Sequence, residues 1–478
     1  MKMTSTPWLE GIEVTVLRTV NDQPTLWDSL LPPECLRMPE ELARVDELLD
    51  DEVFYAPFVP FFHATHGRPS TPMETYLRLM FLKHRYRLGF EALCREVADS
   101  ISWQRFCRIP FGTRVPDPTT LMKITTKCGA AAVEGLNDAL LTKAAAAKLL
   151  RVDRVRVDTT VVEAEVAYPT DSGLLAKAVG KIARTVTRIK ATGAASRTSA
   201  RDRRRAASRR SREISSKLKL RGAQQKDQAQ QAVRRITGEL ADLAQTARRD
   251  ADAVLRNARR ALPKTTGRAK GQLRQAINEL SRTLELTDRL IAQTRVRLSG
   301  ETPDSASRIV SLNDPEARPI RKGRLGKPVE FGYKAQVVDN SDGVILDHNV
   351  EQGAPADAPQ LAPAIARVTK RVGKAPRAVT ADRGYGYASV EQDLHDQGVT
   401  KVVIPRQGKP GAARRELEHR RAFRELVKWR TGCEGRISNL KRNYGWNRTT
   451  LTGLEGARIH CGHGVFAHNL IKIGALAA

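Results

Sequence analysis

Three acidic residues stand where the direction of the chain would bring them together. Asp158 ends a β-branched run, Asp382 ends the segment PRAVTAD, and Glu434 lies in a helical segment after the last expected strand. Because the carboxyl ends of parallel strands meet at one edge of a sheet, we expect the two aspartates side by side, with Glu434 closing the site from its helix. Each aspartate alone could instead be a turn or helix cap, and that interpretation stays open.

Three carboxylates supply the hard oxygen ligands that Mg²⁺ prefers, with Mn²⁺ as a substitute. Two such ions about 3.5–4 Å apart would activate a nucleophile and stabilise the leaving oxygen of a phosphoryl transfer. Basic residues accompany the acids, because Arg383 follows Asp382 and both Arg430 and Lys441 share the helical segment of Glu434. We expect these three cations to contact DNA phosphates.

The segments that would position the acids alternate between strand and helix patterns. A run from Val152 predicts a strand that ends near Asp158, and Asn340-Ser341-Asp342 is typical of a hairpin turn. Asp339 and Asp347, which flank this turn, are interpreted as turn residues. The fold class is therefore α/β, with a mixed sheet flanked by helices. Beyond residue 330 we expect strands at 331–339, 343–350, 376–382 and 401–405, and helices at 356–369, 387–396 and 422–442.

Residues 60–148 have the pattern of a helical domain. Thr71-Pro72-Met73-Glu74 predicts a capping box that begins a helix ending at Gly89, a second helix follows from Phe90, and Asp117 is expected to cap a third. Exposed basic residues on short helices suit a DNA-binding module, and a plain helical bundle is the alternative.

Residues 171–300 form a basic insertion. They hold 32 Lys or Arg and 11 Asp or Glu, which is +21 of the chain's +28, and no aromatic, Cys, Met or His residue. Such a segment lacks the residues of an ordinary core but is rich in helix formers. Apolar residues recur at spacings of three and four over 233–247 and 273–298, which predicts an antiparallel, coiled-coil-like helical hairpin broken at 261–271.

Arginines crowd residues 201–212 of this insertion more densely than solubility requires. We therefore expect them to contact DNA, and a solvated spacer is the alternative. The residues concerned are Arg203, Arg204, Arg205, Arg209 and Arg210.

Composition bounds the rest of the interpretation. A chain of 478 residues predicts two to four structural units, and the net charge of +28 favours a polyanionic partner over a membrane surface, since no apolar anchoring face accompanies it. Six cysteines without a CxxC pair, and a sequence without a signal-like or membrane-spanning run, predict a cytoplasmic protein. The expected division is 1–59, 60–148, 149–170, 171–300 and 301–478.

Histidines gather near the C-terminus at His460, His463 and His468. Their segment includes the apolar helical pattern VFAHNLIKI, so we expect a structural role rather than a metal cluster. The sequence also contains no P-loop or dinucleotide fingerprint, which argues against ATP use.

Four stretches together resemble the bacterial insertion-sequence transposases of the DDE type, in the branch related to the families called IS-four and IS-five. They are VDTTVVEAEVAYPTDSGLL at 157–175, DPEARPIRKGRLGKPVEFGYKAQVVD at 314–339, TADRGY at 380–385 and RTGCEGRISNLKRNYGWNR at 430–448. The region 60–140 is also similar to the helical N-terminal domain of that group.

The resemblance implies an RNase H-like core with Asp158, Asp382 and Glu434 as its acidic triad. It also implies a Mg²⁺-dependent enzyme that cuts and rejoins double-stranded DNA at terminal inverted repeats, as a homodimer associated with the nucleoid. The branch signature Y-x2-R-x3-E-x6-K is matched at its Arg, Glu and Lys, but Val427 stands in place of the tyrosine. Any role of that tyrosine is therefore absent here or taken over by Trp429.

Two other functions remain open from the sequence. One is a structure-selective nuclease on the same fold, which the N-terminal helical domain and the basic insertion argue against. The other is a non-enzymatic protein that bridges DNA, which an intact acidic triad argues against.

Overall fold

The computed structural model describes residues 15–18, 30, 32–219, 223–322 and 326–477. The chain divides into two compact units. The sheet unit comprises residues 1–163, 334–351 and 355–478, and the helical unit comprises residues 164–333 and 352–354. Each unit is described by itself below.

The sheet unit is built around strands β3 (Arg154–Glu163), β5 (Val329–Asn340), β7 (Ala378–Thr380) and β8 (Lys401–Val403), adjacent in the order β5-β3-β7-β8. β3, β7 and β8 run parallel, so the expected neighbours β3 and β7 do lie side by side. β3 continues five residues beyond Asp158. The sequence analysis predicted that the strand ends near Asp158, but this aspartate lies within β3.

β6 (Ile345–Gln352) pairs with β5 through the predicted hairpin, in which the N–H of Asn340 bonds to the carbonyl of Val344 at 3.1 Å. The interpretation of Asp339 and Asp347 as turn residues is wrong. Both lie inside the strands and are buried. A buried carboxylate needs a cationic or hydrogen-bonding partner, and the sequence around the hairpin gave no sign of one.

Helices flank this sheet. They are α12 (Ala358–Val372), α13 (Ala388–Asp396), α14 (Ala412–His419), α15 (Arg421–Arg430) and α16 (Gly432–Asn443). The single helix predicted at 422–442 is divided at Thr431, because its two halves pack on different strands: α15 contacts β7 and β8, whereas α16 contacts β3.

The N-terminal part of the sheet unit is helical. Its elements are β1 (Thr15–Val16), α2 (Pro33–Leu36), α3 (Glu40–Leu49), β2 (Arg68–Pro69), α4 (Met73–Arg85), α5 (Phe90–Asp99), α6 (Ile101–Phe106) and α7 (Pro118–Ala146). Asp117 caps α7 as predicted, but no side chain caps α4, whose N-cap position is Pro72 and not Thr71. The predicted capping box therefore does not form.

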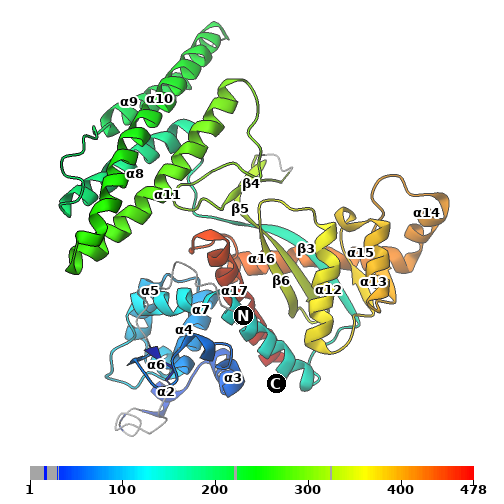
Figure 1. Ribbon diagram of the computed structural model, residues 1–478. Coiled ribbons are helices and arrows are strands. Elements are labelled where there is room, and N and C mark those ends of the chain that lie inside the picture. Colours follow the sequence, from blue (N-terminus) through cyan, green and yellow to red (C-terminus); the bar gives the residue numbers. More distant parts are fainter. Residues whose placement is uncertain (1–14, 19–29, 31, 220–222, 323–325, 478) are drawn as a thin grey trace. The chain divides into compact units, whose positions relative to one another are not determined.

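The C-terminal helix α17 (Gly453–Ala477) packs against α3, α4 and α7 (Figure 1). Its Asn469 side chain forms two hydrogen bonds with the backbone of Ile345 in β6, at 2.8 and 2.9 Å. The last helix thus joins the N-terminal helices to the sheet. No helix in the described part of the chain is both long and apolar enough to cross a lipid bilayer.

The helical unit contains α8 (Asp171–Ala191), α9 (Arg204–Lys217), α10 (Ala223–Ala261) and α11 (Gly267–Leu298), and a strand β4 (Arg318–Arg321) antiparallel to the start of β5. α10 and α11 are the two long helices predicted from the apolar spacings, and their break falls at 262–266. Helices α8, α10 and α11 lie side by side, and α9 packs on α8 and α10 (Figure 1). The recurring apolar residues of 233–247 and 273–298 are here called the apolar seams. Four helices pack around these seams, which form two buried clusters.

Candidate active site

Asp158 and Asp382 belong to neighbouring parallel strands. β3 and β7 pair with Arg154 opposite Ala378 and Arg156 opposite Thr380. The same register, continued by two residues, places Asp158 opposite Asp382, just beyond the end of β7. The Oδ1 atom of Asp382 accepts a hydrogen bond from the N–H of Gly384 at 2.8 Å, which fixes the carboxylate at the start of a short 3₁₀ helix, Arg383–Tyr385.

Glu434 approaches the same place from the first turn of α16. Arg430, at the end of α15, forms ion pairs with Asp158 (Nη1–Oδ2, 3.3 Å) and with Glu434 (Nη2–Oε1, 4.0 Å). Arg430 and Asp158 are mostly buried, whereas the side chain of Glu434 is 71% exposed. One arginine therefore pairs with two of the three acids, Asp158 and Glu434.

The neighbouring charges act on Asp158. Burial is the largest influence and raises the pKa of the Asp158 carboxyl group. The N–H of Thr159 and the charge of Arg430 lower this pKa, and the negative charges of Asp382 and Glu434 raise it, so that the net change is an increase. A cation placed among the three carboxylates would remove their mutual repulsion.

The donor set fits a hard divalent cation by type and charge, because it consists of carboxylate oxygens alone. Across the residues that the structure describes, no three His, Cys, Asp or Glu side chains converge closely enough to hold one ion. Arg430 pairs with both Asp158 and Glu434, so its guanidinium supplies the positive charge beside these two carboxylates. Since Glu434 is largely exposed, turning its side chain toward Asp158 disturbs little packing.

The basic residues expected near the acids differ in their surroundings. Arg383 is exposed at the surface beside Asp382. Arg430 is mostly buried as the partner of Asp158 and Glu434, and Lys441 is half-buried on α16. Arg383 therefore presents its charge to solvent, whereas Arg430 acts inside the site.

The arginines of the helical unit also divide into two groups. Arg203 pairs with Asp250 at 2.5 Å and Arg210 with Glu239 at 3.3 Å, which uses both side chains to hold α9 against α10. The others are exposed and line an open groove on α9, together with Arg212, which the sequence interpretation missed. This exposed group is Arg204, Arg205, Arg209 and Arg212, of which Arg204 also pairs with Asp202 at 2.6 Å.

A buried ion network next to the acids was not predicted. Arg156 of β3 donates two hydrogen bonds to Asp339 of β5, both at 2.9 Å, and Arg436 of α16 donates to the same carboxylate at 3.3 Å. Arg156 also stacks on the Trp429 ring, with its guanidinium carbon 4.7 Å from the ring centroid. One signal was available in the sequence: Arg156 and Asp158 are two residues apart and share one face of their strand.

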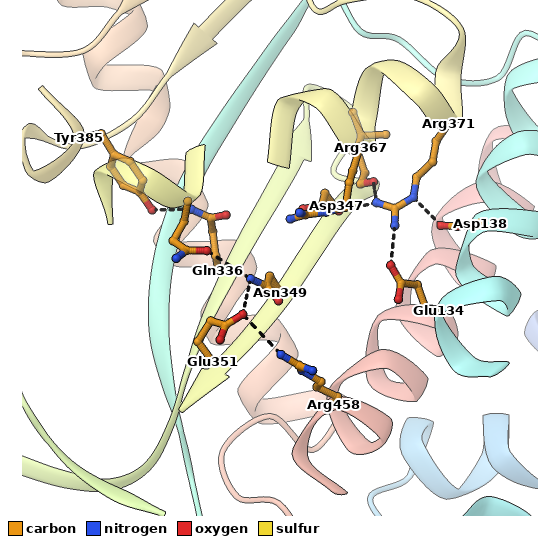
Figure 2. A network of polar contacts seen from close by, with 12 residues as sticks. Glu134, Asp138, Gln336, Asp347, Asn349, Glu351, Arg367, Arg371, Tyr385 and Arg458 are labelled. Atoms are coloured by element: carbon orange, nitrogen blue, oxygen red, sulfur yellow. Dashed lines mark hydrogen bonds and ion pairs between the residues drawn. The ribbon is translucent and has the colours of Figure 1, made fainter. Parts of the chain in front are cut away.

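Figure 2 shows a second network at the edge of the sheet. The buried Asp347 of β6 binds Arg367 of α12 at 2.7 Å and Arg371 of the same helix, and Arg371 also binds Asp138 of α7. Burial would lower the pKa of Arg371, but the charges of Asp347 and Asp138 outweigh it and raise the pKa. The network ties α7 to the sheet.

Figure 2 also shows how the loop after Asp382 is held. The hydroxyl of Tyr385, which is buried, accepts a hydrogen bond from the side-chain amide of Gln336 in β5 at 3.0 Å. This bond fixes the short helix that begins at Asp382 to a neighbouring strand. Burial raises the pKa of Tyr385 well above its usual value, so the hydroxyl stays protonated.

The C-terminal histidines are core residues. His460 and His463 pack against His84 of α4, with ring centroids 5.1 and 5.4 Å apart, and Nε2 of His468 lies 3.0 Å from the carbonyl oxygen of Gly343. Burial lowers the pKa of His460 to about 4 and that of His463 to about 3, so both rings are neutral at pH 7. Their packing supports the structural role expected from the sequence.

Comparisons with known proteins identify two matching families and one relative. Residues 31–127 match a family described as a transposase domain (DUF772), and residues 307–470 match the transposase DDE domain. A Rhizobium meliloti protein described as uncharacterized protein ORF8 in the nfe locus is 31% identical over 147 residues, which are 30% of this chain and 66% of that protein. No solved structure matches the chain.

The two family matches together span more than half of the chain, and the second contains Asp382 and Glu434. The chain therefore belongs to the DDE transposases of insertion sequences, enzymes that cut DNA strands and join them to new sites.

Proposed function

We propose that Asp158, Asp382 and Glu434 are the catalytic carboxylates of this transposase, and that they hold divalent ions, Mg²⁺ or Mn²⁺, for two-metal phosphoryl transfer. One observation carries the proposal: the β3–β7 register, continued two residues beyond its last pair, brings Asp382 opposite Asp158, and Arg430 pairs with both Asp158 and Glu434. A hairpin followed by two parallel strands supports an RNase H-like core, and the assignment to the IS-four and IS-five branch rests on the sequence resemblance.

The chain's own contribution is to hold and orient the reacting groups. Divalent ions, when bound, supply activation of the attacking oxygen and stabilisation of the leaving oxygen. Asp158 is fixed within β3 and Asp382 by its bond to Gly384, so both are rigid ligands, and Glu434 completes the set from α16. Arg430 then presents a positive charge to the phosphate. Cleavage leaves a 3′-hydroxyl, which the same site directs at target DNA.

The test is a cleavage assay on labelled DNA that carries the sequences flanking the gene. We expect Asp158→Asn, Asp382→Asn and Glu434→Gln each to lower strand cleavage more than about 100-fold in Mg²⁺ and to leave DNA binding nearly intact, because each change removes a ligand charge and little volume. Asp153→Asn is the matched control, since Asp153 is exposed near the start of the same strand.

The products of that assay separate the alternatives. A variant of the three acids with near-normal cleavage would remove that residue from the triad. Joined products identify strand transfer, cut products alone indicate a nuclease, and binding without cleavage indicates a bridging protein.

We infer that the exposed arginines of α9 contact DNA phosphates without reading the sequence. Their side chains line one open groove and are exposed, which is the arrangement that a phosphate backbone requires. The sequence analysis also expected Arg203 and Arg210 to contact DNA. The proposal leaves these two out, because they form ion pairs with acidic residues of α10.

We further propose that two copies act together on DNA, since transposition joins two element ends. In a two-fold dimer each helical unit would contact the DNA whose end lies in the partner's site. Mixing Glu434→Gln subunits with subunits that carry Arg205→Gln and Arg209→Gln should then give more activity than either parent. Heterodimers that form on paired ends but never exceed the parents would contradict this arrangement.

A further inference from the structure

Glu434 has few contacts of its own that could fix its position. Its side chain is 71% exposed, and its ion pair with Arg430 is long, at 4.0 Å. The location of its carboxylate therefore depends on where the backbone of α16 lies relative to β3, the strand of Asp158. The groups that hold α16 on the sheet decide that distance.

Arg156 lies at the junction of α15 and α16. Its guanidinium donates two hydrogen bonds to Asp339 and a third to the carbonyl oxygen of Trp429, all at 2.9 Å. The side chain of Arg156 is 9% exposed and that of Asp339 is fully buried. A Cβ atom built on Gly432 would overlap the Arg156 guanidinium, so glycine at residue 432 leaves the space in which this hydrogen-bonded guanidinium lies.

Arg436 holds the same helix one turn further along. Its Nε atom donates to Asp339 at 3.3 Å, and its guanidinium lies against Gly343 in the β5–β6 turn, where a Cβ atom would overlap it. Gly343 has a φ angle of +81°, so a side chain there would also be strained. Glu434 lies between these two attachment points, at Gly432 and Arg436.

We propose that Arg156, Asp339 and Arg436, here called the Asp339 clamp, are positioning residues that set the separation between Glu434 and Asp158. The inference rests on the proposed function of these two acids. Arg156 is two residues from Asp158 on β3, and Arg436 is two residues from Glu434 on α16. One carboxylate, Asp339, is bound by both arginines.

An ion network suits this task better than apolar packing. The paired hydrogen bonds between a guanidinium and a carboxylate fix direction as well as distance, whereas apolar side chains can slide past one another. Ligands that are held by such supporting bonds bind metal more tightly, and loss of the support typically lowers affinity about 10- to 100-fold.

The sharpest test uses two glycines of α16. Gly432→Ala places a Cβ atom where the Arg156 guanidinium lies, so either the helix or the guanidinium must move and the Asp339 clamp is disturbed. Gly435→Ala is the matched control, because nothing lies within 4 Å of a Cβ at Gly435. Mn²⁺ binding to the full chain is measured by the electron paramagnetic resonance signal of free Mn²⁺. We expect Gly432→Ala to bind Mn²⁺ at least about tenfold more weakly than wild type, and Gly435→Ala to match wild type. Equal Mn²⁺ affinity of the two folded variants would overturn the proposal.

A second variant covers the case in which Gly432→Ala fails to fold. Arg436→Gln removes one side of the Asp339 clamp. Its cleavage should need about tenfold more Mn²⁺ for half-maximal rate, yet recover to within about threefold of wild type at saturating Mn²⁺. A purely structural role would lower the rate in proportion to the unfolded fraction and leave the half-maximal concentration unchanged, and that result would overturn the proposal.

Failure of this inference is distinguishable from failure of the proposed function. If Glu434→Gln cleaves normally, the assignment of the triad is wrong. If Glu434→Gln is inactive but Arg436→Gln and Gly432→Ala keep wild-type Mn²⁺ dependence, the triad stands and the Asp339 clamp does not position it.

Discussion

Two groups of arginines, one in each unit, are used in opposite ways. In the sheet unit, Arg156, Arg371 and Arg436 are mostly buried and bind aspartates that are themselves buried. On α9 of the helical unit, Arg205 and Arg209 are exposed and form no ion pair with any described residue. The same residue type therefore forms buried ion pairs in the sheet unit and faces solvent at these two positions of α9.

The net charge of the chain does not distinguish arginines that stabilise the fold from arginines that are available to a partner. An arginine beside a buried carboxylate is needed by the fold, because removing either partner leaves an uncompensated charge. An exposed arginine without a partner costs little to replace, and its charge remains available to a polyanion. The comparison predicts that substitutions in the sheet unit change stability, whereas those on α9 change DNA affinity.

The largest effect on stability is expected for Asp347→Ala. The buried carboxylate of Asp347 is the shared partner of Arg367 and Arg371, so its removal leaves Arg371 with a buried, poorly compensated charge (Figure 2). We expect the free energy of unfolding to fall by about 3–5 kcal/mol, measured by urea denaturation. Asp393→Ala, on the exposed face of α13, is the control and should change it by less than about 0.5 kcal/mol. Similar losses in the two variants would contradict the comparison.

Lys83 is an exception within the sheet unit, and it sharpens the comparison. It is buried on α4, with its ammonium group 4.7 Å from the centroid of the Phe90 ring, and burial lowers its pKa to about 8. The neighbouring His84, His460 and His463 are neutral and supply no negative charge. Lys83→Met should therefore raise the free energy of unfolding at pH 7, by about 1–3 kcal/mol.

The pH dependence of stability checks the cause. Between pH 8 and 10.5 the unfolded chain keeps a proton on Lys83 that the folded chain has lost, so the wild type should gain stability as pH rises through this window. The Lys83→Met variant should lack that gain. A gain of equal size in both proteins would show that other groups cause it.

The smallest effect on stability is expected on α9. Arg205→Gln with Arg209→Gln should leave the free energy of unfolding within about 0.5 kcal/mol of wild type, and should reduce the slope of log affinity for DNA against log salt by up to about two units. Arg203→Gln is the informative counterpart, because Arg203 pairs with Asp250. Arg203→Gln should lower the free energy of unfolding by about 0.5–1 kcal/mol and leave the slope of log DNA affinity against log salt nearly unchanged. An unchanged slope in the double variant would favour the solvated spacer.

Much of the sheet unit was predictable because its strands and helices follow local patterns. The strands of Asp158 and Asp382 were expected to be neighbours, and they are. What could not be predicted depends on contacts between distant residues. Asp339 and Asp347 appear as ordinary turn-flanking acids in the sequence, since their partners lie 183 and 24 residues away.

The helical unit was predicted well in its elements and less well in its packing. Apolar residues at spacings of three and four, in segments rich in helix formers, specify α10 and α11 locally. The spacings did not predict that α8 and α9 also pack on the apolar seams. A spacing pattern indicates that one face of a helix is buried, but it does not indicate which other helix covers that face. The division of the arginines on α9 followed only from that packing.

Helix α17 has a consequence for the order in which the protein can be completed. The helices α3, α4 and α7 contact a segment that follows them by roughly 300–400 residues, and the edge strand β6 finds its Asn469 partner in that same segment. During synthesis the N-terminal helices therefore leave the ribosome long before the helix that buries their apolar faces. The N-terminal helices and strand β6 therefore reach their final packing only when α17 has been released, and a nascent chain interrupted before Gly453 lacks these contacts.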